Sequence, residues 1–252
     1  MNPTSARMPT TSAQYGIWMA QQMAPESPSY WTAETIELRG PLDLAVLSAS
    51  AVEVLNHSQT LHMRFQMDHE GLWQTPQPVV DAPLPVRDFS AEADPDAAAQ
   101  RWMQHTLSVV CDLTRDPLYA SAVLRLAPDR HLWYLQVHHI ALDGYGYSLV
   151  CQAVATRYSA RVRDEALAPL PDWTLDKLVQ AEQAYKAQGR FERDRAFWLQ
   201  QMQYAPGLAT LAPVQAPEYG IPSSTEDACG NDADYGSPDG GSLQASLYNR
   251  HV

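Results

Sequence analysis

Cysteines, basic residues and long apolar runs are all scarce in this chain of 252 residues. The three cysteines, at positions 111, 151 and 229, show no paired spacing, which argues against a disulfide framework and favours a reducing, cytoplasmic setting. Only 17 Lys and Arg stand against 29 Asp and Glu, so binding to nucleic acid is disfavoured, because phosphate binding needs clustered cations. No apolar stretch approaches the roughly 20 residues of a membrane span, and the N-terminus is not expected to be a signal peptide.

Tryptophan and phenylalanine are absent from the last part of the sequence. All seven tryptophans lie between Trp18 and Trp198, whereas 16 of the 47 residues in 206–252 are Pro, Gly or Ser. A segment with so few large apolar groups cannot offset the entropy lost on ordering its backbone. The sequence therefore predicts a packed lobe over residues 1–205 and a disordered, acidic tail over residues 206–252.

Helix and strand signals are interleaved along the packed part. Thr11 and Gln14 have capping-box spacing, and Asp43 and Asp94 each precede an apolar helical stripe. Amphipathic spacing predicts further helices near 178–185 and 191–202, as well as one after the 132–139 segment. Strands are expected at 31–38, 61–67, 72–74, 120–126 and 132–139, and the last four of these form two hairpins. The fold class is therefore α/β (α+β), with a mixed sheet flanked by helices.

Candidate chemistry is concentrated in residues 132–147. Strand alternation points His138 and His139 to opposite faces, and Asp143 and Gly144 follow at a turn before a new helix. Neighbouring side chains that diverge in this way argue against a zinc site. Two interpretations remain open. His139 is either a buried histidine beside a helix-capping aspartate or a general base, since an unperturbed imidazole titrates near pH ~6.5 and accepts protons from amines or hydroxyls.

The stretch HHIALDG, from His138 to Gly144, resembles the HHxxxDG signature of condensation domains from nonribosomal peptide synthetases, which are relatives of chloramphenicol acetyltransferase. Four other segments resemble family motifs in the same order along the chain: Thr11-Ser12-Ala13-Gln14 with Trp18, Thr60-Leu61 with Arg64-Phe65, Cys111-Asp112-Leu113 with Asp116-Pro117-Leu118, and Tyr185 with Asp194, Phe197 and Trp198. Together the motifs cover about residues 8–204. The resemblance implies one chloramphenicol acetyltransferase-like lobe, the N-terminal half of a condensation domain.

The resemblance also implies an activity, in which an acceptor amine attacks a carrier-bound acyl thioester to give an amide. His139 would act as the base or orienting group, with His138 as its support. Asp143 would be structural and held by a buried cation, and Gly144 would keep the loop close to the reacting atoms. The backbone just after Gly144, near Tyr145 and Gly146 at a helix N-terminus, would help to polarise the donor carbonyl. No metal and no cofactor bound by this chain are implied, because phosphopantetheine belongs to the partner carrier proteins.

The implied partners are donor and acceptor peptidyl carrier proteins and adjoining synthetase domains. Neither nucleic acid nor a membrane is expected as a partner. The sequence departs from the family at His62, where an arginine is expected, and Arg64 is the nearby candidate to replace it. A full condensation domain is about twice as long, so the isolated half is expected to lack the opposite wall of the substrate tunnel. Two alternatives stay open: a truncated, non-catalytic relic or carrier-protein interaction module, and a standalone CoA-dependent acyltransferase.

Overall fold

The computed structural model describes residues 7–203, 233–236 and 242–251, in which the chain forms two compact units. Among the described residues, the first unit comprises 7–174, 233–236 and 242–251, and the second comprises 175–203. The helices are α1 (Ser12–Met23), α2 (Leu44–His57), the 3₁₀ helix η1 (Gln59–His62), α3 (Pro95–Leu107), α4 (Gly144–Val162), α5 (Asp176–Ala187) and α6 (Arg190–Met202). The strands are β1 (Met8–Pro9), β2 (Trp31–Arg39), β3 (Met63–Asp68), β4 (Gly71–Pro76), β5 (Val86–Asp88), β6 (Tyr119–Ala127), β7 (Arg130–His138), β8 (Ala233–Gly236) and β9 (Ser242–His251).

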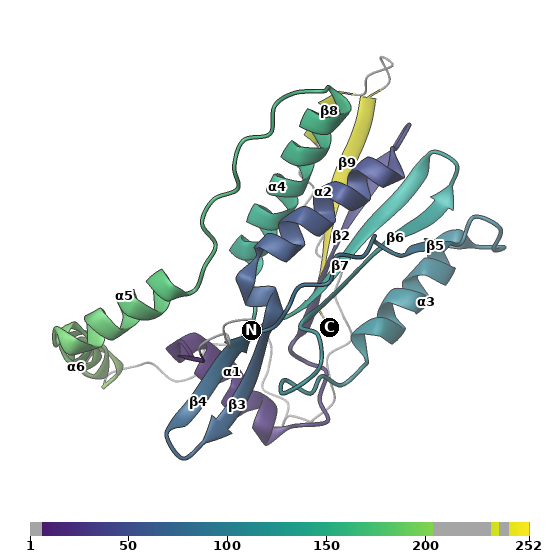
Figure 1. Ribbon diagram of the computed structural model, residues 1–252. Coiled ribbons are helices and arrows are strands. Elements are labelled where there is room, and N and C mark those ends of the chain that lie inside the picture. Colours follow the sequence, from purple (N-terminus) through teal and green to yellow (C-terminus); the bar gives the residue numbers. More distant parts are fainter. Residues whose placement is uncertain (1–6, 204–232, 237–241, 252) are drawn as a thin grey trace. The chain divides into compact units, whose positions relative to one another are not determined.

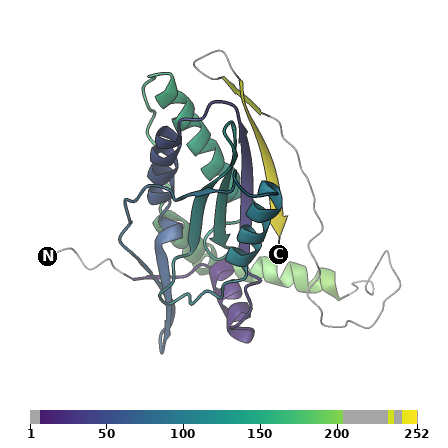
Figure 2. The ribbon, with the colours of Figure 1, turned by 90° about the vertical axis from the view of Figure 1, so that its right-hand side faces the viewer.

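A six-stranded mixed sheet forms the centre of the first unit, in the order β5-β6-β7-β2-β9-β8. Only β5 and β6 pair in parallel among these described strands. Helices α2 and α4 cover one face of the sheet and α3 covers the other (Figures 1 and 2). Strand β7 is therefore central, and it ends at His138, which pairs with Trp31 at the start of β2.

The predicted alternation along β7 is confirmed by its packing. Tyr134 meets Trp102 of α3 edge-on, with ring centroids 5.4 Å apart, so the even-numbered positions face α3. On the opposite face, the hydroxyl of Tyr147 in α4 donates to the carbonyl oxygen of Thr32 in β2 at 2.8 Å. Because all nine residues of β7 except Arg130 are buried, the strand carries the histidine pair on a rigid base.

Three predicted helix starts are confirmed by their capping hydrogen bonds. Thr11 and Gln14 form both bonds of the capping box that opens α1. Asp43 accepts two backbone N–H groups at the start of α2, and Asp94 accepts one at the start of α3. Each side chain satisfies backbone donors that the first helical turn leaves without partners.

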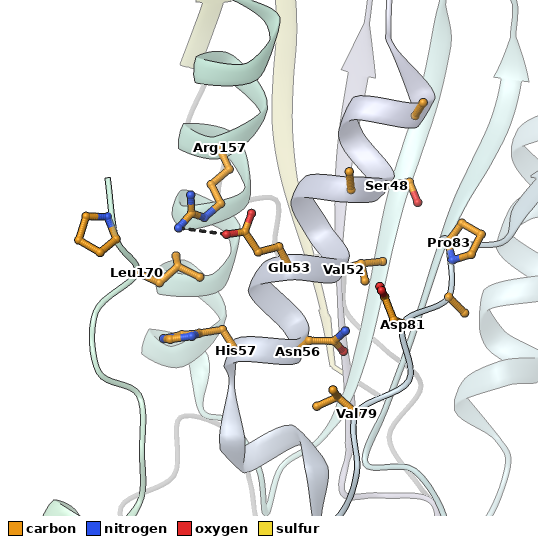
Figure 3. A pocket seen from close by; sticks show the side chains of 14 residues that line it. Ser48, Val52, Glu53, Asn56, His57, Val79, Asp81, Pro83, Arg157 and Leu170 are labelled. Carbon is orange, nitrogen blue, oxygen red and sulfur yellow. Dashed lines mark ion pairs between the residues drawn. The ribbon is translucent and has the colours of Figure 1, made fainter. Parts of the chain in front are cut away.

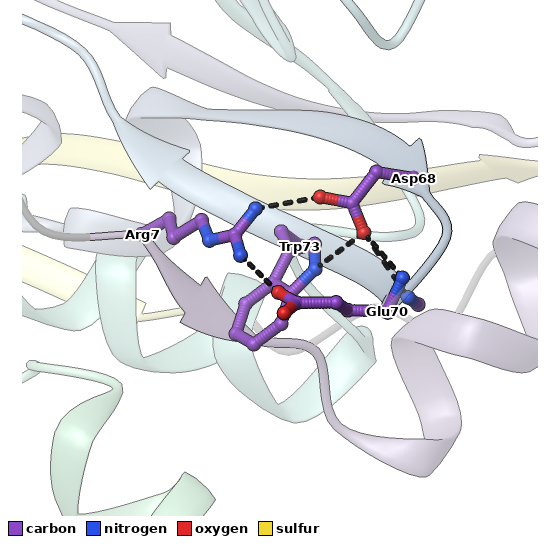
Figure 4. Close-up of polar contacts among 5 residues, drawn as sticks. Arg7, Asp68, Glu70 and Trp73 are labelled. Carbon is purple, nitrogen blue, oxygen red and sulfur yellow. Dashed lines mark hydrogen bonds and ion pairs between the residues drawn. The ribbon is translucent and has the colours of Figure 1, made fainter.

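A smaller sheet, β1-β4-β3, contains the first predicted hairpin. The guanidinium of Arg7 lies 4.1 Å from the ring centroid of Trp73 and forms ion pairs with Asp68, at 2.6 Å, and with Glu70. The indole N–H of Trp73 donates to Asp68 as well, at 3.0 Å (Figure 4). These contacts fasten the segment before β1 to the turn of the β3–β4 hairpin.

The second unit contains the helical pair α5 and α6, which confirms the two helices predicted from amphipathic spacing. Tyr185 of α5 donates its hydroxyl to Asp194 of α6 at 2.8 Å. Gly189 joins the helices with a positive φ of 68°, a conformation that glycine adopts without steric cost. Among the helices of the described residues, none is both long enough and apolar enough to cross a membrane.

The structure differs from the sequence-based expectation in two places. The segment from Gln59 to His62 is a 3₁₀ helix, so β3 begins only at Met63. Within 206–252, where disorder was expected, the structure describes β8 and β9, and β9 pairs antiparallel with β2. Leu243, Ala245 and Leu247 do alternate with polar residues in the sequence of β9, and β2 would otherwise present an unpaired backbone edge there. The other residues of the predicted tail lie outside the described residues.

Candidate active site

The histidine pair lies where β7 ends and the chain turns into α4. The backbone N–H of His139 donates to the carbonyl of Tyr30 at 2.7 Å, and that of Ala141 donates to His138 at 2.8 Å. These bonds close a tight turn immediately after the strand. Asp143 then caps α4, since its Oδ1 accepts the backbone N–H of Gly146 at 2.8 Å. The turn is thus fixed at both ends, by the sheet and by a helix cap.

The imidazole of His139 is partly exposed, and its hydrogen bonding defines its tautomer. Its Nδ1 lies 2.7 Å from the carbonyl oxygen of Leu142. Because a carbonyl oxygen can only accept, Nδ1 must carry the proton in the neutral ring. Nε2 is then the ring nitrogen with a free lone pair. This is the arrangement that a general base requires.

His138 has a different environment, on the opposite face of the sheet. The residue is 1% exposed, and its ring packs against Trp31 at 5.5 Å and Tyr30 at 6.0 Å between centroids. Burial, with a smaller contribution from His139, lowers the pKa of His138 to about 4, so its imidazole is neutral at pH 7. A buried neutral ring supports the turn and has little access to a substrate.

The expectation that a buried cation holds Asp143 is wrong for the part of the chain that the structure describes. Asp143 is exposed, and its carboxylate makes the helix-capping bond but no ion pair there. His62, at the position expected to be arginine, directs Nε2 at the carbonyl of Leu55 at 3.0 Å, and burial lowers its pKa. Arg64 donates to the carbonyl of Met63, so it does not replace the expected arginine.

The expected role of the backbone after Gly144 needs correction at Gly146 and stays a prediction at Tyr145. The N–H of Gly146 is engaged by Asp143 and is therefore not available to polarise a carbonyl group. Gly144 itself is open, and a Cβ built on it would meet no atom within 4 Å. Gly146 is the tighter position, since a Cβ there would lie 2.8 Å from Cδ2 of Leu142.

Two buried polar residues near the turn were missed by sequence reasoning. Glu34 in β2 is 6% exposed, its Oε2 has no hydrogen-bond partner, and burial raises its pKa to about 7. Gln21 in α1 is 4% exposed and contacts His138. A signal for Gln21 was present in the sequence, because Gln14 and Gln21 are seven residues apart and so share one helix face.

A groove of about 1020 Å³ lies away from the histidines, over the outer surface of α2 (Figure 3). Its lining includes Glu53, which forms ion pairs with Arg157 at 3.2 Å and with Arg161 at 2.6 Å. Figure 3 shows Asn56 and His57 on the same helix, pointing to different sides of it. The arginines neutralise the carboxylate of Glu53, and one ring nitrogen of His57 lies 2.6 Å from the carbonyl oxygen of Pro171.

The sequence profile of the family described as "Condensation domain" matches residues 4–227. The chain is 38% identical over 202 residues to a dimodular nonribosomal peptide synthase of Bacillus subtilis, covering 80% of this chain and 8% of that protein. It is 33% identical over 218 residues to enterobactin synthase component F of Escherichia coli, covering 84% of this chain and 17% of that protein. The chain therefore belongs to the condensation domain family.

Solved structures agree with this assignment. A mutant starter condensation domain of rhizomide synthetase, in complex with C8-CoA and Leu-SNAC, matches with a TM-score of 0.77 and 34% identity, over 84% of this chain and 49% of that one. The first condensation domain of the CDA synthetase matches with a TM-score of 0.71 and 35% identity, over 81% and 52%. The chain thus spans about half the length of these solved condensation domains.

Proposed function

We propose that this chain provides one lobe of an amide-forming condensation domain, with His139 as the base or orienting group. The observation that carries the proposal is the 2.7 Å contact between Nδ1 of His139 and the carbonyl of Leu142, which leaves Nε2 unprotonated. In the proposed step the acceptor amine attacks the carbonyl carbon of an acyl thioester while Nε2 takes a proton from the amine. The C–S bond then breaks, the thiolate leaves and is protonated, and the products are an amide and a free thiol.

The other residues of the turn have supporting roles in this proposal. His138 anchors the turn to the protein interior, Asp143 caps α4, and Gly144 leaves room for the reacting groups. In the proposal, the donor and acceptor groups are held on phosphopantetheine arms of carrier proteins. The chain works next to adjoining synthetase domains, and its location is cytoplasmic. The relatives described above are multidomain synthetases, which supports partners of this kind.

The test uses the parent synthetase containing this chain, with C8-CoA and Leu-SNAC as probes, because a similar domain was solved with both compounds. His139→Ala is expected to slow amide formation by about 10²- to 10⁴-fold, the usual range for losing a general base. His105→Ala is the matched control, because His105 is exposed on α3. Amide formation at the parental rate in His139→Ala would show that His139 has another role.

A second candidate is a non-catalytic module that binds carrier proteins. The observation favouring it is that Asp143, in the described part of the chain, lacks the ion pair expected for a functional loop. This candidate predicts that the chain binds a loaded carrier protein but leaves its thioester intact. The remaining alternative, a standalone CoA-dependent acyltransferase, predicts that the isolated chain turns over acetyl-CoA with a small amine.

A further inference from the structure

The side chain of Gln21 is oriented by three backbone carbonyl groups at the end of α1. Its Nε2 lies 3.3 Å from the oxygen of Ala24, 3.3 Å from that of Pro25 and 3.0 Å from that of Ser27. Carbonyl oxygens accept hydrogen bonds and cannot donate them, so the amide nitrogen has to face this cluster. The amide oxygen of Gln21, Oε1, must therefore point the other way, toward His138.

This orientation determines which nitrogen of His138 carries the proton. Oε1 of Gln21 lies 3.4 Å from Nε2 of His138 and can only accept, so Nε2 has to be the donor. Burial keeps the ring neutral, which leaves Nδ1 of His138 without a proton. Nδ1 accordingly accepts the backbone N–H of Ile140 at 3.3 Å.

Ile140 belongs to the same turn that carries His139. The turn is closed by the N–H of Ala141 on the carbonyl of His138, and on its far side Nδ1–H of His139 donates to Leu142. A change of tautomer at His138 would place an N–H group against the N–H of Ile140. The turn would then have to open, and Leu142 would shift relative to the ring of His139.

We propose that Gln21 is a positioning residue for His139, acting through the tautomer of His138 and the N–H of Ile140. Gln21 is distant in sequence from the histidines, and no substrate contact is required of it. The hydrogen bonds from Gln21 to His138 and from Ile140 to His138 connect the C-terminal turn of α1 to the turn after β7. In each bond the chemistry of the partners decides which group donates and which accepts. We call this chain of hydrogen bonds from Gln21 through His138 to Ile140 the relay. Its effect on catalysis rests on the proposed function, whereas the hydrogen bonds themselves do not.

The test measures imidazole tautomers by ¹⁵N nuclear magnetic resonance on the full chain. Gln21→Met keeps the length of the side chain but removes both the amide oxygen and the amide nitrogen. Gln21→Glu keeps the shape of the side chain but places a second oxygen against the three backbone carbonyl groups. Gln21→Met is expected to lose the Nε2–H signature of His138 and to give a mixed tautomer at His139, whereas Gln21→Glu, which still presents an oxygen to Nε2 of His138, is expected to keep that signature. Gln22→Met is the matched control, because Gln22 is the next residue of α1 and is exposed.

Unchanged tautomers at His138 and His139 in Gln21→Met would overturn the proposal. A lower melting temperature with unchanged tautomers would have the same meaning, since it would show that Gln21 only fills space. In the parent synthetase, Gln21→Met is expected to lower kcat for amide formation by about 10- to 100-fold with KM little changed, the range typical of residues that orient a functional group. If the tautomers shift while the unmodified synthetase forms no amide, the relay stands and the proposed function fails.

Discussion

Leu142 connects the ring of His139 to the first turn of α4. Its carbonyl oxygen accepts from Nδ1 of His139 at 2.7 Å, and its side chain lies where a Cβ on Gly146 would have to fit, at 2.8 Å. The orientation of the candidate base therefore depends on how closely the start of α4 approaches the turn. This relationship leads to the first prediction.

Gly146→Ala is expected to destabilise the fold by about 1 kcal/mol, because the overpacking cost exceeds the gain from alanine's helix propensity. Gly144→Ala is the comparison, since its added methyl group meets open space. The free energy of unfolding of Gly144→Ala is expected within about 0.5 kcal/mol of the parent value. Urea unfolding measures both variants, and a larger loss for Gly144→Ala than for Gly146→Ala would contradict this account.

Asp143 acts as a helix cap in this structure, and its charge has no partner in an ion pair among the described residues. Asp143→Asn keeps a capping oxygen and is expected to change stability by less than about 0.5 kcal/mol, whereas Asp143→Ala should cost about 1 kcal/mol. Thermal or chemical unfolding distinguishes the two. A loss of several kcal/mol in Asp143→Asn would reveal a cation that holds the carboxylate after all.

The hydroxyl of Tyr147 joins α4 to β2 through the carbonyl of Thr32. Tyr147→Phe removes this buried donor and is expected to cost about 1–2 kcal/mol of unfolding free energy. Tyr145→Phe serves as the control, because Tyr145 is 73% exposed and should tolerate the change. Equal stability of the two variants would mean that the buried bond contributes nothing measurable.

Glu34 should make stability depend on pH, because burial raises its pKa from 4.5 to about 7. Between these two values the folded protein keeps a proton that the unfolded chain releases, so this contribution to stability falls as the pH rises and is lost above pH 7. Glu34→Gln removes the titrating group. Its stability relative to the parent is expected to increase by about 3 kcal/mol between pH 4 and pH 8.

Urea unfolding of both proteins across this pH range provides the measurement. His138, whose pKa is lowered to about 4, acts in the opposite direction, since its contribution is full above about pH 6.5 and falls as the pH decreases. That effect is common to both proteins and cancels in the difference. A difference that stays constant with pH would show that Glu34 is not a buried, uncompensated carboxyl group.

Much of the fold was predictable because its signals are local. The capping residues Thr11, Asp43 and Asp94 act on backbone groups two or three positions away, so their sequence spacing is sufficient to place helix starts. Alternation along β7 likewise separates His138 from His139 without any knowledge of the neighbouring strands. The position of β3 was less predictable, because η1 replaces part of the expected strand where tertiary contacts override propensity.

For the candidate site, the sequence by itself determined the residues of the turn and their opposite directions, since these follow from chain geometry. Only the tertiary structure decided which nitrogen of His139 is free, that Asp143 has no ion-pair partner among the described residues, and that Gln21 contacts His138. The physical reason is that protonation and pairing depend on the folded path of the chain, which brings the carbonyl of Leu142 to Nδ1 of His139 within the turn and Gln21 to His138 from a distant segment. Burial of Glu34 and the pairing of β9 with β2 depend on such long-range packing in the same way.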